Sequence, residues 1–158
     1  MQSSYSSTDI YHSISCKPSA SRSFELFLGA ETKLQFIKHQ LCIPKGVILF
    51  TEGENSKGIY LIVSGRLMLT ADLSKDARLI THIVGAQQVL GLSASILGAA
   101  NECTAEAVES CQVEFIERRD LLHLMCEHNE VCLRLARLVS DDCRRIFELR
   151  RLFTILNV

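Results

Sequence analysis

Residues 44–65 read PKGVILFTEGENSKGIYLIVSG and contain two short apolar runs, 47–50 and 59–63, that are rich in β-branched and aromatic residues. Glycines punctuate the stretch at Gly46, Gly53, Gly58 and Gly65. Because glycine adopts positive φ angles without steric cost, each of them suits a tight turn beside a short strand. The close spacing of turns and apolar runs predicts a small antiparallel barrel with sharp corners, because the apolar runs are too short to form helices.

The chain after residue 65 continues this pattern of strands and turns. Apolar and polar residues alternate over 66–71, which indicates a half-exposed strand. Residues 72–76 are predicted to form a hairpin tip, 77–84 the returning strand, and 89–90 a further short strand. No crossover helix separates these pieces, so we expect them to form a meander.

The segments before residue 44 give weaker signals. Residues 33–43 are predicted as a strand because a Pro-Lys-Gly turn follows them directly. A serine, Ser21 or Ser23, is predicted to cap a short helix over 24–28. The serine-rich start of the chain lacks periodicity and is expected to be a mobile tail. The predicted division is therefore a tail at 1–20, a β-roll with short helices at 21–127 and a long helix at 128–158.

The opening motif matches a known family at seven positions with the family's spacing. These positions are Pro44, Gly46, Phe50, Gly53, Glu54, Tyr60 and Gly65. The pattern resembles the cyclic-nucleotide-binding domain, and specifically the sensor domain of Crp/Fnr-type bacterial regulators. Residues 104–107 and 108–116 look like the last barrel strands of that family, and 119–122 looks like the start of its closing helices. The resemblance implies a mainly β fold with some helix: an antiparallel β-roll or jelly roll followed by a long dimerisation helix.

Residues 91–100, GLSASILGAA, correspond to the ligand-binding segment of the family. There a short helix presents backbone N–H groups to a cyclic phosphate. The family pattern adds a Glu after the first Gly for the ribose and an Arg about ten residues later for the phosphate. This chain has Leu92 at the first place and Asn101-Glu102-Cys103 at the second. A carboxylate near a phosphate is repulsive, so binding of ordinary cyclic AMP or GMP is not expected.

Two interpretations of the pocket remain open at this point. Either the pocket is filled by core side chains, namely Leu90, Leu92, Ile96 and Leu97, or it is adapted to a different, less anionic ligand. No cofactor is predicted beyond an unidentified small-molecule effector. The candidate pocket residues are Leu90, Gly91, Leu92, Ser93, Ala94, Cys103 and Thr104.

Residues 129–156 contain no glycine or proline, so one long helix is predicted there. An apolar stripe with a single acid has members alternately three and four residues apart, which is the spacing of a coiled-coil seam. The resemblance adds that Crp/Fnr-type regulators dimerise through this helix. The predicted homodimer interface is Leu135, Val139, Asp142, Ile146, Leu149 and Phe153. A second stripe is assigned to the side that packs on the barrel: Leu133, Leu138, Phe147 and Leu152. The alternative is that the whole apolar surface packs within one chain.

Composition limits the function further. The chain has 158 residues, a hydrophobic content of 47% that can fill one core, and a net charge of −1 that gives no bias toward nucleic acid. It has no membrane-spanning run and no export signal, so a cytoplasmic location is expected. The seven scattered cysteines are then expected to be reduced, without a metal or iron–sulfur site.

These observations favour a regulatory, non-catalytic module. An enzyme is not predicted because the sequence has no H-x-H pair and no nucleophile beside a base. After residue 153 too few residues remain for a helix-turn-helix, so this chain is expected to bind no DNA by itself. The first hypothesis is a dimeric Crp/Fnr-type sensor domain. The alternative is a ligand-independent interaction module that forms heterodimers with, or modulates, full-length regulators.

Overall fold

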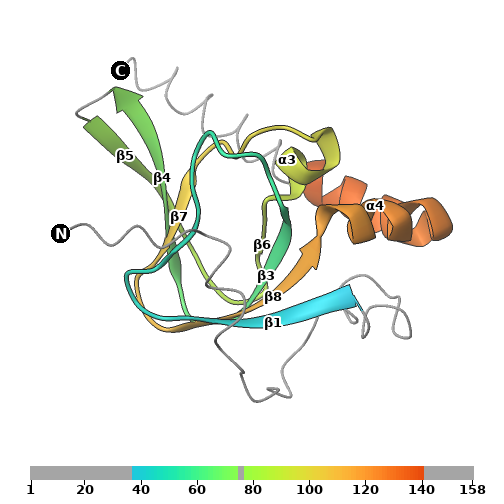
Figure 1. The fold of residues 1–158 in the computed structure, drawn as a ribbon, viewed down its shortest axis with the longest axis horizontal. Helices are drawn as coiled ribbons and strands as arrows, with labels where there is room; N and C mark the ends of the chain where they lie inside the picture. The colour runs from blue at the N-terminus through green and yellow to red at the C-terminus, as the bar shows by residue number, and fades with distance from the viewer. Residues whose placement is uncertain (1–36, 75–76, 141–158) are drawn as a thin grey trace.

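The computed structural model describes residues 37–74 and 77–140, which form two facing four-stranded sheets with helices beside one of them (Figure 1). One sheet has the order β1 (Lys38–Ile43), β8 (Cys111–Glu117), β3 (Gly58–Ser64) and β6 (Val89–Leu90). The other has the order β2 (Ile48–Phe50), β7 (Thr104–Ala107), β4 (Leu67–Ser74) and β5 (Ala77–Val84). The helices are α3 (Leu92–Leu97), α4 (Arg118–Glu127) and a helix over 129–140.

Every strand pair in these sheets is antiparallel, which confirms the predicted roll. The predicted meander is wrong, because β4 and β5 are the only described strands that pair with their neighbour in the chain. The predicted returning strand and the predicted short strand at 89–90 are β5 and β6, with the bounds expected. The strand predicted over 33–43 is described only from Lys38, and β8 begins at Cys111 rather than at 108. Residue 108 instead donates its N–H to the Arg66 carbonyl at 3.1 Å, outside the ladder of β8.

Strand β3 is apolar along its whole length because both of its faces are buried. Tyr60 and Ile62 point into the core between the two sheets. Ile59 and Leu61 point the other way, into a second cluster formed with α4 and the helix over 129–140. A strand covered on both faces gains nothing from polar residues, which explains the continuous apolar run in the opening motif.

Three aromatic rings lie at the centre of the roll and account for two motif positions. The ring centroids of Tyr60 and Phe115 are 4.7 Å apart, and those of Phe50 and Tyr60 are 5.6 Å apart. These distances are within the range in which aromatic pairs add about 0.5–1.5 kcal/mol beyond burial of their area. Phe50 from β2 and Tyr60 from β3 therefore join the two sheets.

The turn between β3 and β4 requires glycine at position 65. Gly65 has φ +88°, and a Cβ there would lie 2.6 Å from the Ser110 carbonyl oxygen and 2.7 Å from the Cys111 sulfur. A larger residue would be strained by its backbone conformation and would also collide with the start of β8. The turn predicted at Gly65 is thus held in a tightly packed corner.

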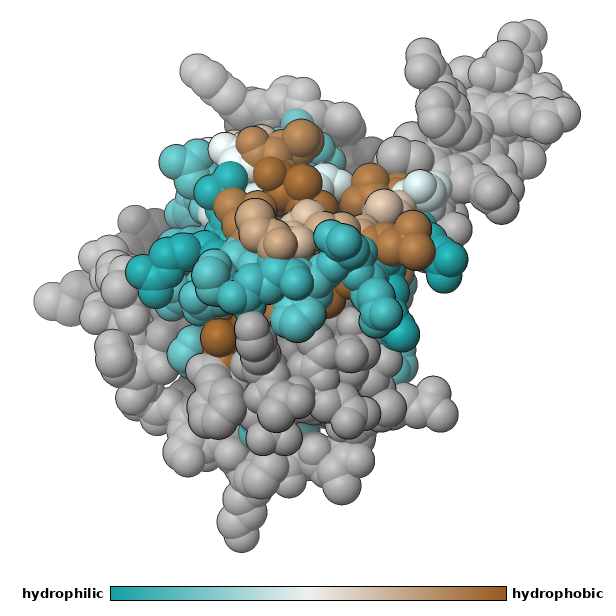
Figure 2. Space-filling model, turned by 90° about the vertical axis from the view of Figure 1, so that its right-hand side faces the viewer, coloured by the Kyte–Doolittle hydropathy of each residue, from teal (hydrophilic) through white to brown (hydrophobic). Residues whose placement is uncertain are grey.

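The helical layer packs on the outer face of the sheet that contains β3, and this side also carries exposed apolar surface beside a hydrophilic belt (Figure 2). Leu135 is fully buried there and Val139 packs against the same cluster, whereas Leu133 is 56% exposed. The sequence assigned Leu135 and Val139 to a dimer seam and Leu133 to the barrel side. Leu135 and Val139 therefore contact the barrel within one chain and Leu133 does not, whereas Leu138 of the second stripe packs against the same cluster as predicted. The assignment of Leu135 and Val139 to a dimer interface stays a prediction.

Some predictions fall on residues that the structure does not describe. They include the tail over 1–20, the helix over 24–28 and the interface residues Asp142, Ile146, Leu149 and Phe153. Among the described cysteines, Cys42 is disulfide-bonded, so the prediction of reduced cysteines is wrong at that position. The thiols of Cys103, Cys111, Cys126 and Cys132 are free. None of the described helices combines the length and the apolar character needed to span a membrane.

Candidate ligand cavity

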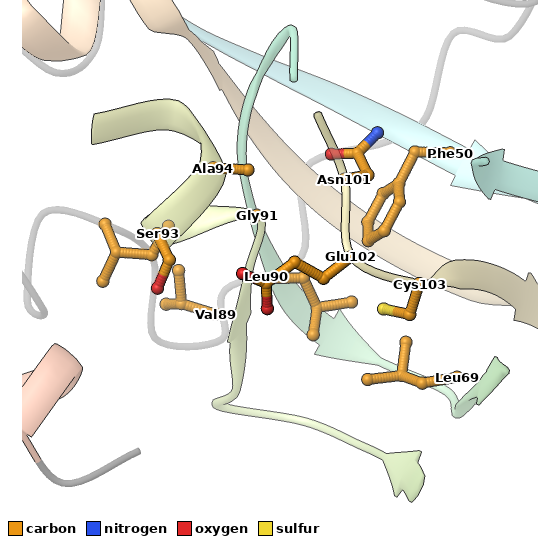
Figure 3. Close-up of a pocket in the computed structure, with 11 residues that line it drawn as sticks. Phe50, Leu69, Val89, Leu90, Gly91, Ser93, Ala94, Asn101, Glu102 and Cys103 are labelled. Carbon is orange, nitrogen blue, oxygen red and sulfur yellow. The ribbon is translucent and has the colours of Figure 1, made fainter. Parts of the chain in front are cut away.

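A cavity of about 200 Å³ opens between the start of α3 and the segment that precedes β7 (Figure 3). Its walls come from four places in the chain: β2, β4, the segment from β6 into α3, and residues 101–103. The lining residues are Phe50, Leu69, Val89, Leu90, Gly91, Leu92, Ser93, Ala94, Asn101, Glu102 and Cys103. Most of them are apolar, and the polar groups lie on the two segments that meet at the mouth.

Six of the seven candidate pocket residues line this cavity. They are Leu90, Gly91, Leu92, Ser93, Ala94 and Cys103. The seventh, Thr104, lies behind the wall, where its hydroxyl accepts a hydrogen bond from the Glu52 backbone N–H at 2.9 Å. Leu92 also packs against α4 in the second cluster, and Leu97, which the filled-pocket interpretation places inside the barrel, is 75% exposed. Leu97 therefore does not fill the space.

Three apolar lining residues, Phe50, Leu69 and Val89, were not among the candidates. Phe50 was visible in the motif, but only as a core position, and Leu69 was visible as one member of an alternating strand. The pairing of Leu69 with Ala105 of β7 brings β4 beside the segment that carries Cys103. This register depends on contacts between residues far apart in the chain, so no local pattern could reveal it.

The wall that carries Asn101 is fixed by the first turn of the opening motif. The Gly53 N–H donates to the Asn101 carbonyl at 2.9 Å, and the Asn101 N–H donates to the Glu54 carbonyl at 2.8 Å. The Asn101 side-chain amide also donates to the Thr51 carbonyl at 3.2 Å. Asn101 is buried, and these bonds satisfy its backbone groups and its amide donor. The cavity wall is thus held as part of the roll and does not depend on a ligand for its shape.

Helix α3 is held at its centre by Ser95, which is fully buried. The hydroxyl groups of Ser56 and Ser95 are 2.7 Å apart, and the guanidinium Nε of Arg118 donates to the Ser95 carbonyl at 2.7 Å. Arg118 is the first residue of α4, so a charge-assisted hydrogen bond joins the two helices. A displacement of α3 would therefore also displace the start of α4.

The electrostatic character of the cavity is negative. Among the described residues that line it, none is lysine, arginine or histidine, and Glu102 is a carboxylate. Burial raises the pKa of the Cys103 thiol, and the negative charges of Glu102 and Glu52 raise this pKa further. The negative charges that disfavour a thiolate at Cys103 would also disfavour a phosphate bound at the same wall, because both groups are anions.

The guanidinium of Arg118 lies outside the cavity lining. It binds the Ser95 carbonyl behind α3, and Arg118 is not among the lining residues.

The hydrogen bond from Arg118 predicts a measurable effect on α3. Arg118→Gln is expected to lower the free energy of unfolding by about 1–2 kcal/mol, because a half-buried charged donor is lost while the Ser95 carbonyl stays buried. It should also speed hydrogen exchange at the Ala99 amide, which donates to the Ala94 carbonyl at the end of α3.

Arg119→Gln is the matched control for this change. The Arg119 side chain is 86% exposed and lies 3.8 Å from Asp120, so its loss should change the stability by less than about 0.5 kcal/mol. Equal exchange rates at Ala99 in the two variants would show that Arg118 does not anchor α3.

More than half of this chain matches the sequence model of one protein family. The model of the cyclic nucleotide-binding domain matches residues 40–128, which is more than half of the 158-residue chain. The chain belongs to the cyclic nucleotide-binding domain family. This assignment confirms the resemblance that the opening motif carried.

Solved structures and curated proteins are similar to large parts of this chain. The catabolite activator protein of Thermus thermophilus is similar with a TM-score of 0.68 and 21% identity, over 74% of this chain and 55% of that one. A cyclic nucleotide-binding domain from Methylobacillus flagellatus gives a TM-score of 0.65 and 22% identity, over 71% and 65%. The lysophospholipase nte1 of Neurospora crassa is 22% identical over 129 residues, which are 82% of this chain but 8% of the lysophospholipase. The chain thus spans only a part of the proteins it matches.

Proposed function

We propose that this chain is a regulatory, non-catalytic sensor domain of the Crp/Fnr type, whose cavity receives an effector other than ordinary cyclic AMP or GMP. The observation that supports this most directly is the cavity itself, which is lined by part of the segment that the resemblance assigns to ligand binding but has no cation among its described lining residues. Within the described ranges no group of three or more His, Cys, Asp or Glu side chains could hold a metal.

The loss of the usual anion partners has an energetic consequence. A hydrogen bond between a charged group and its partner contributes about 1.5–3 kcal/mol, and the lining offers none of this kind to a phosphate. Glu102 would repel the phosphate, and Leu92 has no acceptor for a ribose hydroxyl. Backbone N–H groups at the start of a helix as short as α3 do not compensate for these losses.

The proposal predicts that isothermal titration calorimetry gives no saturable heat with cyclic AMP or cyclic GMP up to about 1 mM, equivalent to binding weaker than about −4.1 kcal/mol. The Glu102→Gln variant should behave in the same way, because it removes a repulsive charge without supplying a cation. Micromolar binding of either nucleotide to the unmodified protein would refute the proposal.

The proposed signal passes from the cavity to the helices. An effector that binds more tightly when α3 is in one of two positions increases the fraction of molecules with α3 in that position. The hydrogen bond from Arg118 to α3 transmits this shift of α3 to α4. The helix over 129–140 follows α4 and packs on the same cluster through Leu135. We propose that two copies pair through the continuation of this stripe, Asp142, Ile146, Leu149 and Phe153, so that a shift of α4 changes their pairing.

A further inference from the structure

The size of the cavity limits the ligand to a compact molecule. A volume of about 200 Å³ is below the roughly 300–1,000 Å³ typical of sites for drug-sized ligands. It is somewhat above the roughly 150 Å³ of an apolar cavity that accepts benzene. An aromatic ring with a short side chain is therefore about the largest body that fits.

The inner part of the cavity favours an apolar body. Phe50, Leu69 and Leu90 lie there, and Figure 3 shows the Phe50 ring and the Leu69 side chain directed toward the same space as the Cys103 sulfur. Burial of a ring against such groups contributes roughly 25 cal/mol for each Å² removed from water. The neutral thiol of Cys103 is compatible with this surface, since burial and the nearby carboxylates keep its pKa raised.

The mouth of the cavity carries a carboxylate without a partner in the described part of the chain. Figure 3 shows the Glu102 side chain extending across the opening toward Ser93 of α3. No hydrogen bond or ion pair of the Glu102 side chain occurs among residues 37–74 and 77–140. Glu52 adds a second negative charge whose field reaches Cys103, while its own carboxylate accepts a hydrogen bond from the Asp72 N–H at 2.7 Å.

We propose that the cavity binds a compact arylalkylamine-type ligand, with its apolar ring against Phe50, Leu69 and Leu90 and its protonated amine at the Glu102 carboxylate. This inference rests on the proposed function, because it names the class of effector for the same cavity. The amine meets the carboxylate at the exposed rim, so it keeps part of its hydration while the ring is desolvated. The positive charge of the amine is opposite to that of a cyclic phosphate. A ligand of this kind does not need the arginine that the family pattern provides for the phosphate, and this arginine is absent from the described lining.

Three probes of nearly equal shape test the proposal on the full chain: 2-phenylethylamine, 2-phenylethanol and phenylacetate. The affinities are measured by titration of amide NMR signals, and the shifts are expected at Gly91 and Cys103. The amine should bind about fivefold to tenfold more tightly than phenylacetate, with the alcohol between them, because the ring contacts are shared and only the charge at the rim differs.

The second part of the test replaces the Glu102 carboxylate. Glu102→Gln should reduce the affinity for the amine to that of the alcohol and leave the alcohol unchanged. Glu130→Gln, which removes the same charge from the exposed surface of the helix over 129–140, should change neither. Equal affinity for amine and phenylacetate, or an unchanged affinity for the amine in Glu102→Gln, would overturn the charge assignment.

Failure of the ligand class can be distinguished from failure of the proposed function. If none of the three probes shifts the signals of Gly91 and Cys103, the arylalkylamine class is wrong. The proposed function fails by a separate result, the calorimetric binding of a cyclic nucleotide.

Discussion

Gly58→Ala is expected to lower the free energy of unfolding by at least about 3 kcal/mol, at the upper end of the effects of overpacking. Gly58 begins β3 opposite Glu117 of β8. A Cβ at this position would collide with the Ile116 carbonyl oxygen and would lie 2.7 Å from a ring carbon of Phe115. The nearest group is backbone and cannot rotate away, so β3 and β8 would have to separate.

The expected loss is large because the two strands carry both hydrophobic clusters. Phe115 belongs to the core between the sheets, and Ile116 belongs to the cluster under α4. A displacement of β8 at Gly58 would disturb both. Since the total stability of a domain is about 5–15 kcal/mol, a loss of this size removes a large part of it.

Urea denaturation followed by far-UV circular dichroism measures this effect, and Gly85→Ala is the matched control. Gly85 also lacks a positive φ, but the nearest atoms to its added Cβ are 3.8 Å away. Alanine there should leave the midpoint unchanged or raise it slightly by restricting the unfolded chain. Similar midpoints for the two variants would show that the contact between β3 and β8 at Gly58 is looser than described.

Short strands between strong turn signals were predictable from the sequence. Strands β5 and β6 have the bounds expected for them, because turn residues mark their ends. The bounds of β7 agree with those implied by the family resemblance. The opening motif also predicted the positive φ at Gly46, Gly53 and Gly65 from local chemistry. The same expectation is wrong at Gly58, which has no positive φ and is the first residue of β3. Local signals of this kind do not depend on which strands become neighbours.

What the sequence could not supply is the identity of the neighbour that covers each apolar face. The spacing of Leu133 and Leu135 shows that they lie on different sides of a helix, but it does not show which side meets the barrel. The lining of the cavity by Leu69 depends in the same way on the register of β4 with β7. Leu97, which one of the two open interpretations of the pocket placed inside the barrel, is exposed, because α3 packs through Leu92 and Ile96.

The place of Leu135 leads to the second large effect. Leu135→Ala is expected to lower the free energy of unfolding by about 2–5 kcal/mol, because it removes buried methyl groups and leaves a cavity in the cluster with Ile59 and Leu61 of β3. Leu133→Ala, two residues earlier in the same helix, should change the stability by less than about 0.5 kcal/mol, since Leu133 is 56% exposed. Urea denaturation compares the two variants.

Sedimentation of the same variants separates packing within the chain from pairing between chains. Leu135→Ala should leave the dissociation constant of the proposed homodimer within about threefold of the unmodified value, because a residue fully buried in its own chain does not contact a partner. Phe153→Ala should weaken the dimer by about tenfold or more, as expected when an aromatic side chain is removed from an interface. If Leu135→Ala dissociates the dimer as strongly as Phe153→Ala, then Leu135 belongs to the seam and the helix leaves the barrel when two chains pair. A protein that sediments as a monomer at all concentrations would instead refute the homodimer, and Leu135 would keep only its role in holding the helix on the barrel.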